Sequence, residues 1–299
     1  MNSTTTIMNK KFLIASILLI TVGLVLISNA IAQAQSQNEF TVPLGDPAKR
    51  GKLNAHLNYG SITVKGTARK DILVKYASAE EDDENENLNK DLNKNLNKNR
   101  RDEDDNSRAG LKRIGGGGMD LEVTESNNEV KIHSNSWNHR LNLEIEVPSG
   151  MDLQLHTYNG GDLMVTNVQG ELALSNYNGE ITALNISGSV VASTYNGEIK
   201  VTFDGVTSNT PMSYSTYNGD IDLTFPASLK ATLKMKTEQG EILTGFDVNI
   251  TSSGPVQMKD TKAGITRIVV DDWKRGDVNG GGPEITMKNY NGDILIRKK

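Results

Sequence analysis

A short unit recurs through the second half of the chain and consists of Tyr-Asn-Gly, an acidic residue and an aliphatic residue. The tyrosines of the unit are Tyr158, Tyr177, Tyr195, Tyr217 and Tyr290. The first four are 19, 18 and 22 residues apart, and a longer gap precedes the last. Degenerate copies read Asn58-Tyr-Gly-Ser61-Ile and Glu238-Gln-Gly-Glu241-Ile. Half-copies lie between full ones, so five turn glycines are spaced by nine residues: Gly161, Gly170, Gly179, Gly188 and Gly197. A fixed short period of this kind is the signature of a repeat architecture.

The residues of the unit predict a tight turn followed by a half-buried strand. Asn and Gly enter left-handed backbone conformations at little cost, so Asn-Gly marks the turn. Apolar residues alternate after it, as in Ile199-Lys-Val201-Thr-Phe203, which predicts one buried face. Alternation also runs from Leu141 to Leu155, and no apolar stripe of helical period follows the N-terminal segment. The chain is therefore expected to be all-β.

Two all-β architectures fit the repeat. Asn-Gly between short strands is a strong signal for a hairpin, so an antiparallel β-meander is one of them. The other is a parallel β-solenoid, a β-helix-like repeat domain in which rungs of two strands and two turns stack on each other. We favour the solenoid, because stacking explains why the same turn residues return at every second strand.

The repeat domain is predicted to cover residues 119–299, and a β-rich segment at 38–76 is expected to complete or cap it. The chain stops directly after the repeat strand Ile294–Ile296. We therefore expect this strand to be the last rung, with an edge open to pairing. Arg297, Lys298 and Lys299 would guard that edge by their charge.

The first 34 residues have the organisation of a secretory signal peptide. Lys10 and Lys11 precede an apolar run from Phe12 to Ile27, and Ala-x-Ala sites follow within residues 30–34. The run approaches the ~20 residues of a membrane span, so an uncleaved anchor is the alternative. No second apolar span follows. The sequence thus predicts an exported protein, periplasmic or secreted to the cell surface, with no stable membrane span after cleavage.

Residues 77–118 are predicted to be a disordered, charged and glycine-rich insertion. Residues 79–108 contain 11 acidic and 6 basic residues and few apolar ones, too few to offset the entropy of ordering the segment. Four glycines at 115–118 extend it. The chain as a whole has a formal net charge of −5, which argues against nucleic acid as a partner.

The strands and turns together resemble the putative adhesin family, a set of uncharacterised bacterial exported β-repeat proteins. The resemblance rests on the Tyr-Asn-Gly-Glu/Asp-Ile units and on the segment Val147-Pro-Ser-Gly-Met-Asp-Leu153 that precedes them. It covers residues 141–297, with a weaker extension back to Phe40. It implies a parallel β-solenoid-like domain in a cell-envelope setting, and it supplies no binding residue. The insertion at residues 79–108 departs from the family pattern.

Two rows of side chains are candidate sites. The five repeat tyrosines are expected to form an aromatic row along one edge, either a glycan-binding stripe or a stacking ladder that stabilises the turns. The acidic residues after the turn glycines are expected to form a second row, either a Ca²⁺ site or a solvated row; they are Asp162, Glu171, Glu180, Glu198, Asp220, Glu241 and Asp293. We favour the stacking ladder and the solvated row.

No catalytic residue, cofactor-binding residue or metal ligand is predicted. The four histidines (His56, His133, His139 and His156) are scattered along the sequence without metal-ligand spacing, and no nucleophile motif is present. The sequence therefore favours a non-catalytic adhesin-like module that binds or scaffolds an unknown envelope protein or glycan. The alternatives are a structural or signalling partner of another envelope protein and a β-helix enzyme acting on polysaccharides.

Overall fold

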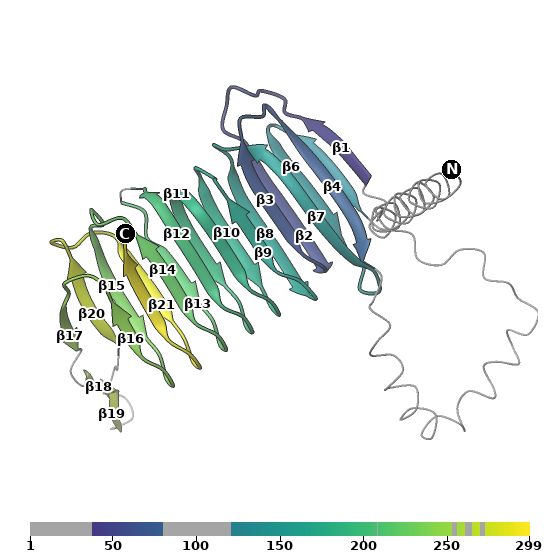
Figure 1. The fold of residues 1–299 in the computed structure, drawn as a ribbon. Helices are drawn as coiled ribbons and strands as arrows, with labels where there is room; N and C mark the ends of the chain where they lie inside the picture. The colour runs from purple at the N-terminus through teal and green to yellow at the C-terminus, as the bar shows by residue number, and fades with distance from the viewer. Residues whose placement is uncertain (1–37, 80–120, 208, 253–255, 261–264, 270–272) are drawn as a thin grey trace, which may run out of the picture. The chain divides into compact units, whose positions relative to one another are not determined.

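The computed structural model describes residues 38–79, 121–207, 209–252, 256–260, 265–269 and 273–299 (Figure 1). The predicted signal peptide and nearly all of the predicted insertion lie outside these residues. The described chain consists of β-strands joined by turns, and Glu39–Lys299 forms one compact unit. Most strands pair in parallel, so the fold is all-β and solenoid-like, and the antiparallel meander is not the arrangement of the repeats.

The strands form two long sheets. Strands of the first sheet, in spatial order, are β6 (Glu129–Ser134), β2 (Lys52–Tyr59), β8 (Asp152–Asn159), β10 (Glu171–Asn176), the second half of β11 (Ile181–Ser193), β13 (Met212–Ser215), β21 (Glu284–Lys288) and β15 (Ala231–Lys236). Strands of the second sheet are β7 (Arg140–Pro148), β3 (Ile62–Thr67), β9 (Leu163–Thr166), the first half of β11, β12 (Ile199–Val206), β14 (Ile221–Phe225), β22 (Ile294–Lys298) and β16 (Ile242–Thr244). Each rung supplies one strand to each sheet, and β11 runs through both.

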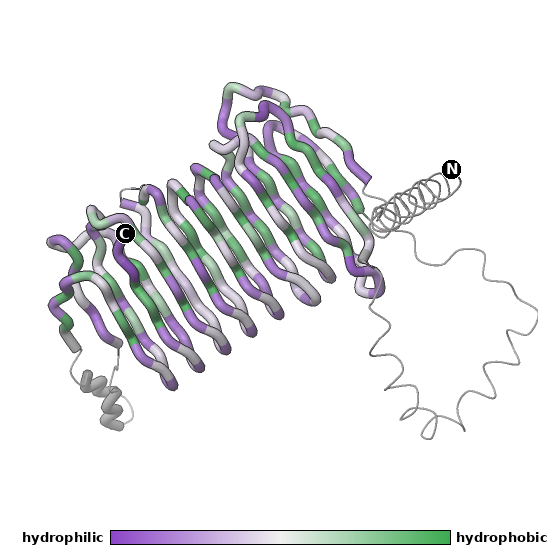
Figure 2. Tube along the Cα trace, viewed as in Figure 1, coloured by the Kyte–Doolittle hydropathy of each residue, from purple (hydrophilic) through white to green (hydrophobic). Residues whose placement is uncertain are grey.

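Alternating side chains of both sheets meet in one hydrophobic core. Ile181, Ile199 and Ile221 occupy equivalent positions on neighbouring strands and are fully buried. Phe203 and Phe225 stack inside the core with ring centroids 4.9 Å apart. Figure 2 shows the result as hydrophobic positions that line up from strand to strand across the sheets. The period-2 pattern of the sequence is thus what places one column of side chains in the interior.

The order of the rungs differs from their order in the chain. The N-terminal rung, β2 and β3, lies between the rung of β6 and β7 and the rung of β8 and β9. The C-terminal rung, β21 and β22, lies between the rung of β13 and β14 and the rung of β15 and β16. The expectation that Ile294–Ile296 form an exposed last rung is therefore wrong, because β22 is paired on both sides.

Antiparallel strands adjoin both ends of the first sheet and the β7 end of the second sheet. β4 (Asp71–Ala79) pairs with β7, and β5 (Glu122–Ser126) pairs with β6. β20 (Lys274–Val278) pairs with β15, and β17 (Asn249–Ser252) pairs with β20. The remaining strands are β1 (Asn38–Pro43), which pairs with β4, and the hairpin of β18 (Val256–Asp260) and β19 (Ile265–Val269).

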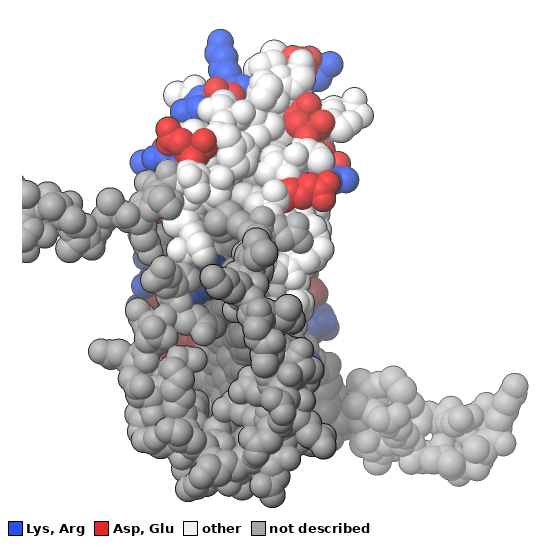
Figure 3. Space-filling view, turned by 90° about the vertical axis from the view of Figure 1, so that its right-hand side faces the viewer, with Lys and Arg blue, Asp and Glu red and all other residues white. Residues whose placement is uncertain are grey.

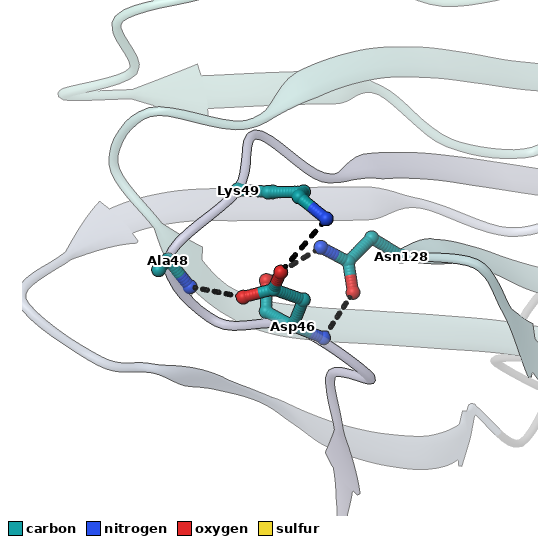
Figure 4. A network of polar contacts seen from close by, with 4 residues as sticks. All are labelled: Asp46, Ala48, Lys49 and Asn128. Carbon is teal, nitrogen blue, oxygen red and sulfur yellow. Dashed lines mark hydrogen bonds and ion pairs between the residues drawn. The ribbon is translucent and has the colours of Figure 1, made fainter.

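The chain entering the N-terminal rung is fixed by a polar network around Asp46 and Asn128 (Figure 4). Asp46 N–H donates to Asn128 Oδ1 at 2.7 Å, and Asn128 Nδ2 donates to the Asp46 carbonyl at 2.6 Å. Asn128 has a φ of +62° in the turn between β5 and β6, where an asparagine is well tolerated. This reciprocal pair ties the loop before β2 to the strand pair on which β2 docks.

Candidate interaction surface

The five repeat tyrosines lie in one row at the turn edge of the first sheet. Their rings are nearly parallel, with interplanar angles of 3–7° and centroids 4.6–5.1 Å apart. The order in space is Tyr158, Tyr177, Tyr195, Tyr217 and Tyr290, and each is about 40 % exposed. We call this row, together with Trp137 described below, the aromatic ladder.

Glycine is required two residues after each ladder tyrosine, because the backbones of neighbouring turns lie in direct contact there. Gly197 has a φ of +153°, and a Cβ placed on it would lie 2.1 Å from the Gly179 carbonyl oxygen. The glycine carbonyls accept hydrogen bonds from a buried Thr or Asn side chain that precedes each tyrosine. Thr157 Oγ1 donates to Gly60 O at 2.7 Å, and Thr194 Oγ1 donates to Gly179 O at 3.0 Å. The same contact is made by Asn176, Thr216 and Asn289.

The asparagines that follow the tyrosines form a second ladder beside the first. Asn196 Nδ2 donates to Asn178 Oδ1 at 2.7 Å, and the contact repeats at the same distance from Asn218 and from Asn291. In this turn the positive φ belongs to the glycine, whereas these asparagines lie outside the left-handed region. The predicted reason for Asn, a left-handed backbone conformation, is therefore wrong at this position, because the side chain serves amide-to-amide pairing between rungs.

Stacking determines which part of each tyrosine a ligand can reach. Because each interior ring is covered on both faces by its neighbours, it presents an edge and a hydroxyl group. Trp137 ends the ladder, meeting Tyr158 at 78° with centroids 5.3 Å apart, and is 57 % exposed. Glu238 occupies the position beyond Tyr290, because Gln239 pairs with Asn291. Trp137 is thus the aromatic end of the ladder with open ring surface, and the sequence analysis did not place it there.

The acidic row serves the backbone of neighbouring rungs. Asp162 Oδ1 accepts a hydrogen bond from Glu180 N–H, Asp220 Oδ1 from Asp293 N–H, and Asp293 Oδ1 from Glu241 N–H, each at 2.8 Å. Partial burial raises the pKa of Glu198, which Lys200 lowers and the neighbouring carboxylates raise further. No group of three His, Cys, Asp or Glu residues suited to a metal ion occurs among the described residues. On the face shown in Figure 3, acidic and basic residues are mixed rather than separated by sign.

Three of the four histidines are not scattered but form a column on the outer face of the first sheet. His56 lies opposite His133 on one side and His156 on the other. The His56 and His156 rings stack at 4.7 Å and 12°, and the His56 and His133 rings lie 5.3 Å apart at 33°. His139 lies outside the column, between β6 and β7. Each histidine of the column comes directly after the second of two buried apolar residues that alternate along the strand, as in Leu153-Gln-Leu155-His156. Aligning the three segments on this pattern would have revealed the column.

A pocket of about 490 Å³ lies at the opposite, loop edge of the rungs. Its lining includes Asp204, Lys230, Met212 and the loop Gly281-Gly282-Pro283. Lys299 Nζ lies 2.6 Å from Asp204 Oδ1, so the carboxylate is already paired. This lining does not assemble the several acidic and basic groups that cleavage of an acidic polysaccharide would need.

Comparison with known proteins identifies the fold. The Toastrack DUF4097 family model matches residues 31–279. The chain belongs to this family. Among solved structures, the toastrack domain is similar to a putative cell adhesion protein from Clostridium sporogenes, with 13 % identity over 88 % of this chain and 100 % of the other and a TM-score of 0.43. It is also similar to a putative adhesin from Bacteroides fragilis, with 10 % identity over 89 % of this chain and 98 % of the other and a TM-score of 0.37.

A search of curated proteins finds no match. Within the part of the toastrack chain that the structure describes, no helix is long and apolar enough to cross a membrane.

Proposed function

We propose that this toastrack domain is a non-catalytic, adhesin-like binding module of an exported cell-envelope protein, and that its ligand contacts the Trp137 end of the aromatic ladder. The observation that carries the proposal is the 57 % exposed Trp137 ring at the end of a row of stacked tyrosines. A large aromatic ring held at the surface is a common anchor of binding sites. Tyr158, on which Trp137 packs, belongs to β8, and this strand is held in place by backbone pairing with β2 and β10.

The chemistry of the ladder indicates how a ligand would bind. The covered tyrosine faces favour hydrogen bonding to hydroxyl and amide groups along the row over stacking on each ring. Trp137 supplies the apolar contact at one end, where an open indole face suits a sugar ring or an apolar side chain. A glycan of the envelope or matrix is the ligand that combines these two features, and an envelope protein is the second candidate.

The experiment compares the binding of wild-type protein and two variants to a glycan array and to native envelope extract. Trp137→Ala should weaken binding at least roughly tenfold, as expected for the loss of one anchor residue. Val191→Ala is the matched control, because Val191 is an exposed apolar residue on the outer face of the first sheet, and three strands lie between its strand β11 and the strand β6 that precedes Trp137. Circular dichroism and melting temperature establish that both variants are folded.

The outcomes separate the functional classes. Glycan binding that depends on Trp137 supports the adhesin-like module, and capture of one specific envelope protein without a glycan signal supports the scaffold. Equal binding by wild type and Trp137→Ala would exclude the ladder end as the site. Turnover of a uronic-acid polymer by the purified protein would contradict the non-catalytic assignment.

A further inference from the structure

The histidine column lies where the N-terminal rung is inserted into the stack. His56 is the middle member and belongs to β2, whereas His133 and His156 belong to β6 and β8, the strands on either side. Residues of β2 on the other face, Leu53, Ala55 and Leu57, are fully buried. The three imidazoles are therefore the outer-face contact between an early segment of the chain and the two later segments that enclose it.

Protonation changes the sign of this contact. Neutral imidazole rings at 4.7–5.3 Å attract one another by stacking. Two imidazolium ions at the same distance repel, and partial burial limits the water that would screen them. Burial, together with the charge of His56, lowers the pKa of His156. The folded rung consequently binds fewer protons than the unfolded chain, and its stability decreases as the pH falls below the ordinary histidine range.

The groups around the column offer little compensation. On the column's two outer flanks, Glu122 of β5 faces His133 and the neutral Ser175 of β10 faces His156. Along the strands, charged residues of the outer face near the column form two ion pairs, Lys131 with Glu129 and Arg50 with Asp152. Lys52 adds a positive charge on β2 itself. Thus, among the residues that the structure describes, one carboxylate lies directly opposite an end of the column, and no carboxylate lies opposite the His56 and His156 pair on the paired strands.

The column is also connected to the loop that carries Trp137. His56 Nε2 lies 3.0 Å from Asn58 Oδ1, and Asn58 Nδ2 donates to the Asn135 carbonyl at 3.0 Å. Asn58 is 9 % exposed, so this chain of contacts is largely shielded from solvent. A displacement of β2 would be transmitted to the loop two residues before Trp137.

From this geometry we infer that His133, His56 and His156 form a pH-sensitive latch on the inserted N-terminal rung. At neutral pH the stacked rings hold β2 between β6 and β8. At mildly acidic pH the charged rings weaken this seat and increase local opening of β2 and β3, while the rungs from β12 to β22 stay closed. The latch is a property of the fold and does not depend on the ligand proposed above.

Hydrogen exchange of the full chain at pH 7.5 and pH 5.5 tests the latch. After correction for the intrinsic pH dependence of exchange, the β2 amides should lose protection severalfold at pH 5.5, because the unfolded chain binds protons that the folded column disfavours. The β13 and β14 amides serve as the internal reference and should keep theirs. Equal protection of β2 relative to this reference at both pH values would overturn the proposal.

Variants identify the residues responsible. His56→Gln removes both ring contacts of the column and should reduce the pH-dependent loss in β2, whereas His139→Gln, which changes the histidine outside the column, should retain the full loss. If His56→Gln does not fold, His156→Gln provides the same comparison at the edge of the column. A pH-dependent loss that is undiminished after removal of either column histidine would contradict the latch, even if the wild-type protein opens at pH 5.5.

Discussion

Tyr217 stacks on Tyr290 with ring centroids 4.6 Å apart and ring planes within 4°, although 73 residues separate them in the chain. The rung that follows Tyr217 in sequence, at Glu238, lies on the far side of Tyr290. The aromatic ladder is therefore continuous only because the C-terminal rung inserts between two earlier ones. Insertion of the C-terminal rung brings Tyr290 into the ladder, and the stacking of Tyr290 on Tyr217 in turn stabilises the inserted rung.

Replacing the central ladder residue tests the stabilising role of stacking. Tyr195→Ala removes two ring pairs, with Tyr177 and Tyr217, and should lower the free energy of unfolding by about 1–3 kcal/mol, since a stacked aromatic pair contributes about 0.5–1.5 kcal/mol. Tyr195→Phe keeps the ring and should be nearly neutral. Urea unfolding measures both variants. An unchanged midpoint for Tyr195→Ala would show that the ladder does not stabilise the fold.

The turn glycine can be tested against a matched control. Gly197→Ala places a Cβ 2.1 Å from the Gly179 carbonyl oxygen at a φ of +153°, so the turn must shift, and we expect a loss of at least about 2 kcal/mol. Gly150→Ala is the control, because no atom lies within 4 Å of its added Cβ. Thermal unfolding of both proteins gives the comparison, and similar losses in the two would contradict the backbone-stacking explanation.

The buried threonine of the unit is expected to be needed for its hydroxyl group. Thr157→Val preserves shape but leaves the Gly60 carbonyl without its donor, which should cost about 1–3 kcal/mol. Thr157→Ser retains the hydroxyl and should cost less. Chemical unfolding distinguishes the two, and a valine variant as stable as the serine variant would exclude the hydrogen bond as the reason for Thr at this position.

The acidic row predicts a pH dependence opposite in sign to that of the histidine latch. The pKa of Glu198 is raised, chiefly by burial, so the folded state binds this proton more tightly than the unfolded chain. Its contribution to stability is present below the ordinary glutamic acid pKa and is lost as the pH rises through the raised value. Glu198→Gln should therefore be more stable than wild type at pH 7, and the difference should vanish toward pH 4. Melting temperatures across this range test it, and a less stable variant at pH 7 would contradict it.

Local parts of the structure follow from the sequence, whereas the order of the rungs does not. The alternation in Ile199-Lys-Val201-Thr-Phe203 predicts the core column, and the recurring Tyr-Asn-Gly units predict equivalent stacked turns, because each pattern can be recognised in a short stretch of sequence. Which rung stacks on which is decided by the fit of whole strands that are far apart in sequence. Tyr217 and Tyr290 are adjacent for this reason, and the histidine column arises because β2 lies between β6 and β8.

The interleaved rungs also set the moment at which the domain can close. The strand containing Leu53 needs partners at residues 129–134 and 152–159, so it stays without them until the chain has been made as far as residue 159. The strand pair at residues 284–298 fills an interior slot, so the stack remains interrupted until these two strands have paired. Pairings of such long range close slowly, because the entropy of closing the intervening loop is lost before the contacts form. Interleaving therefore delays completion of the core until both inserted rungs have paired, and it makes the loss of either inserted rung a defect of the interior.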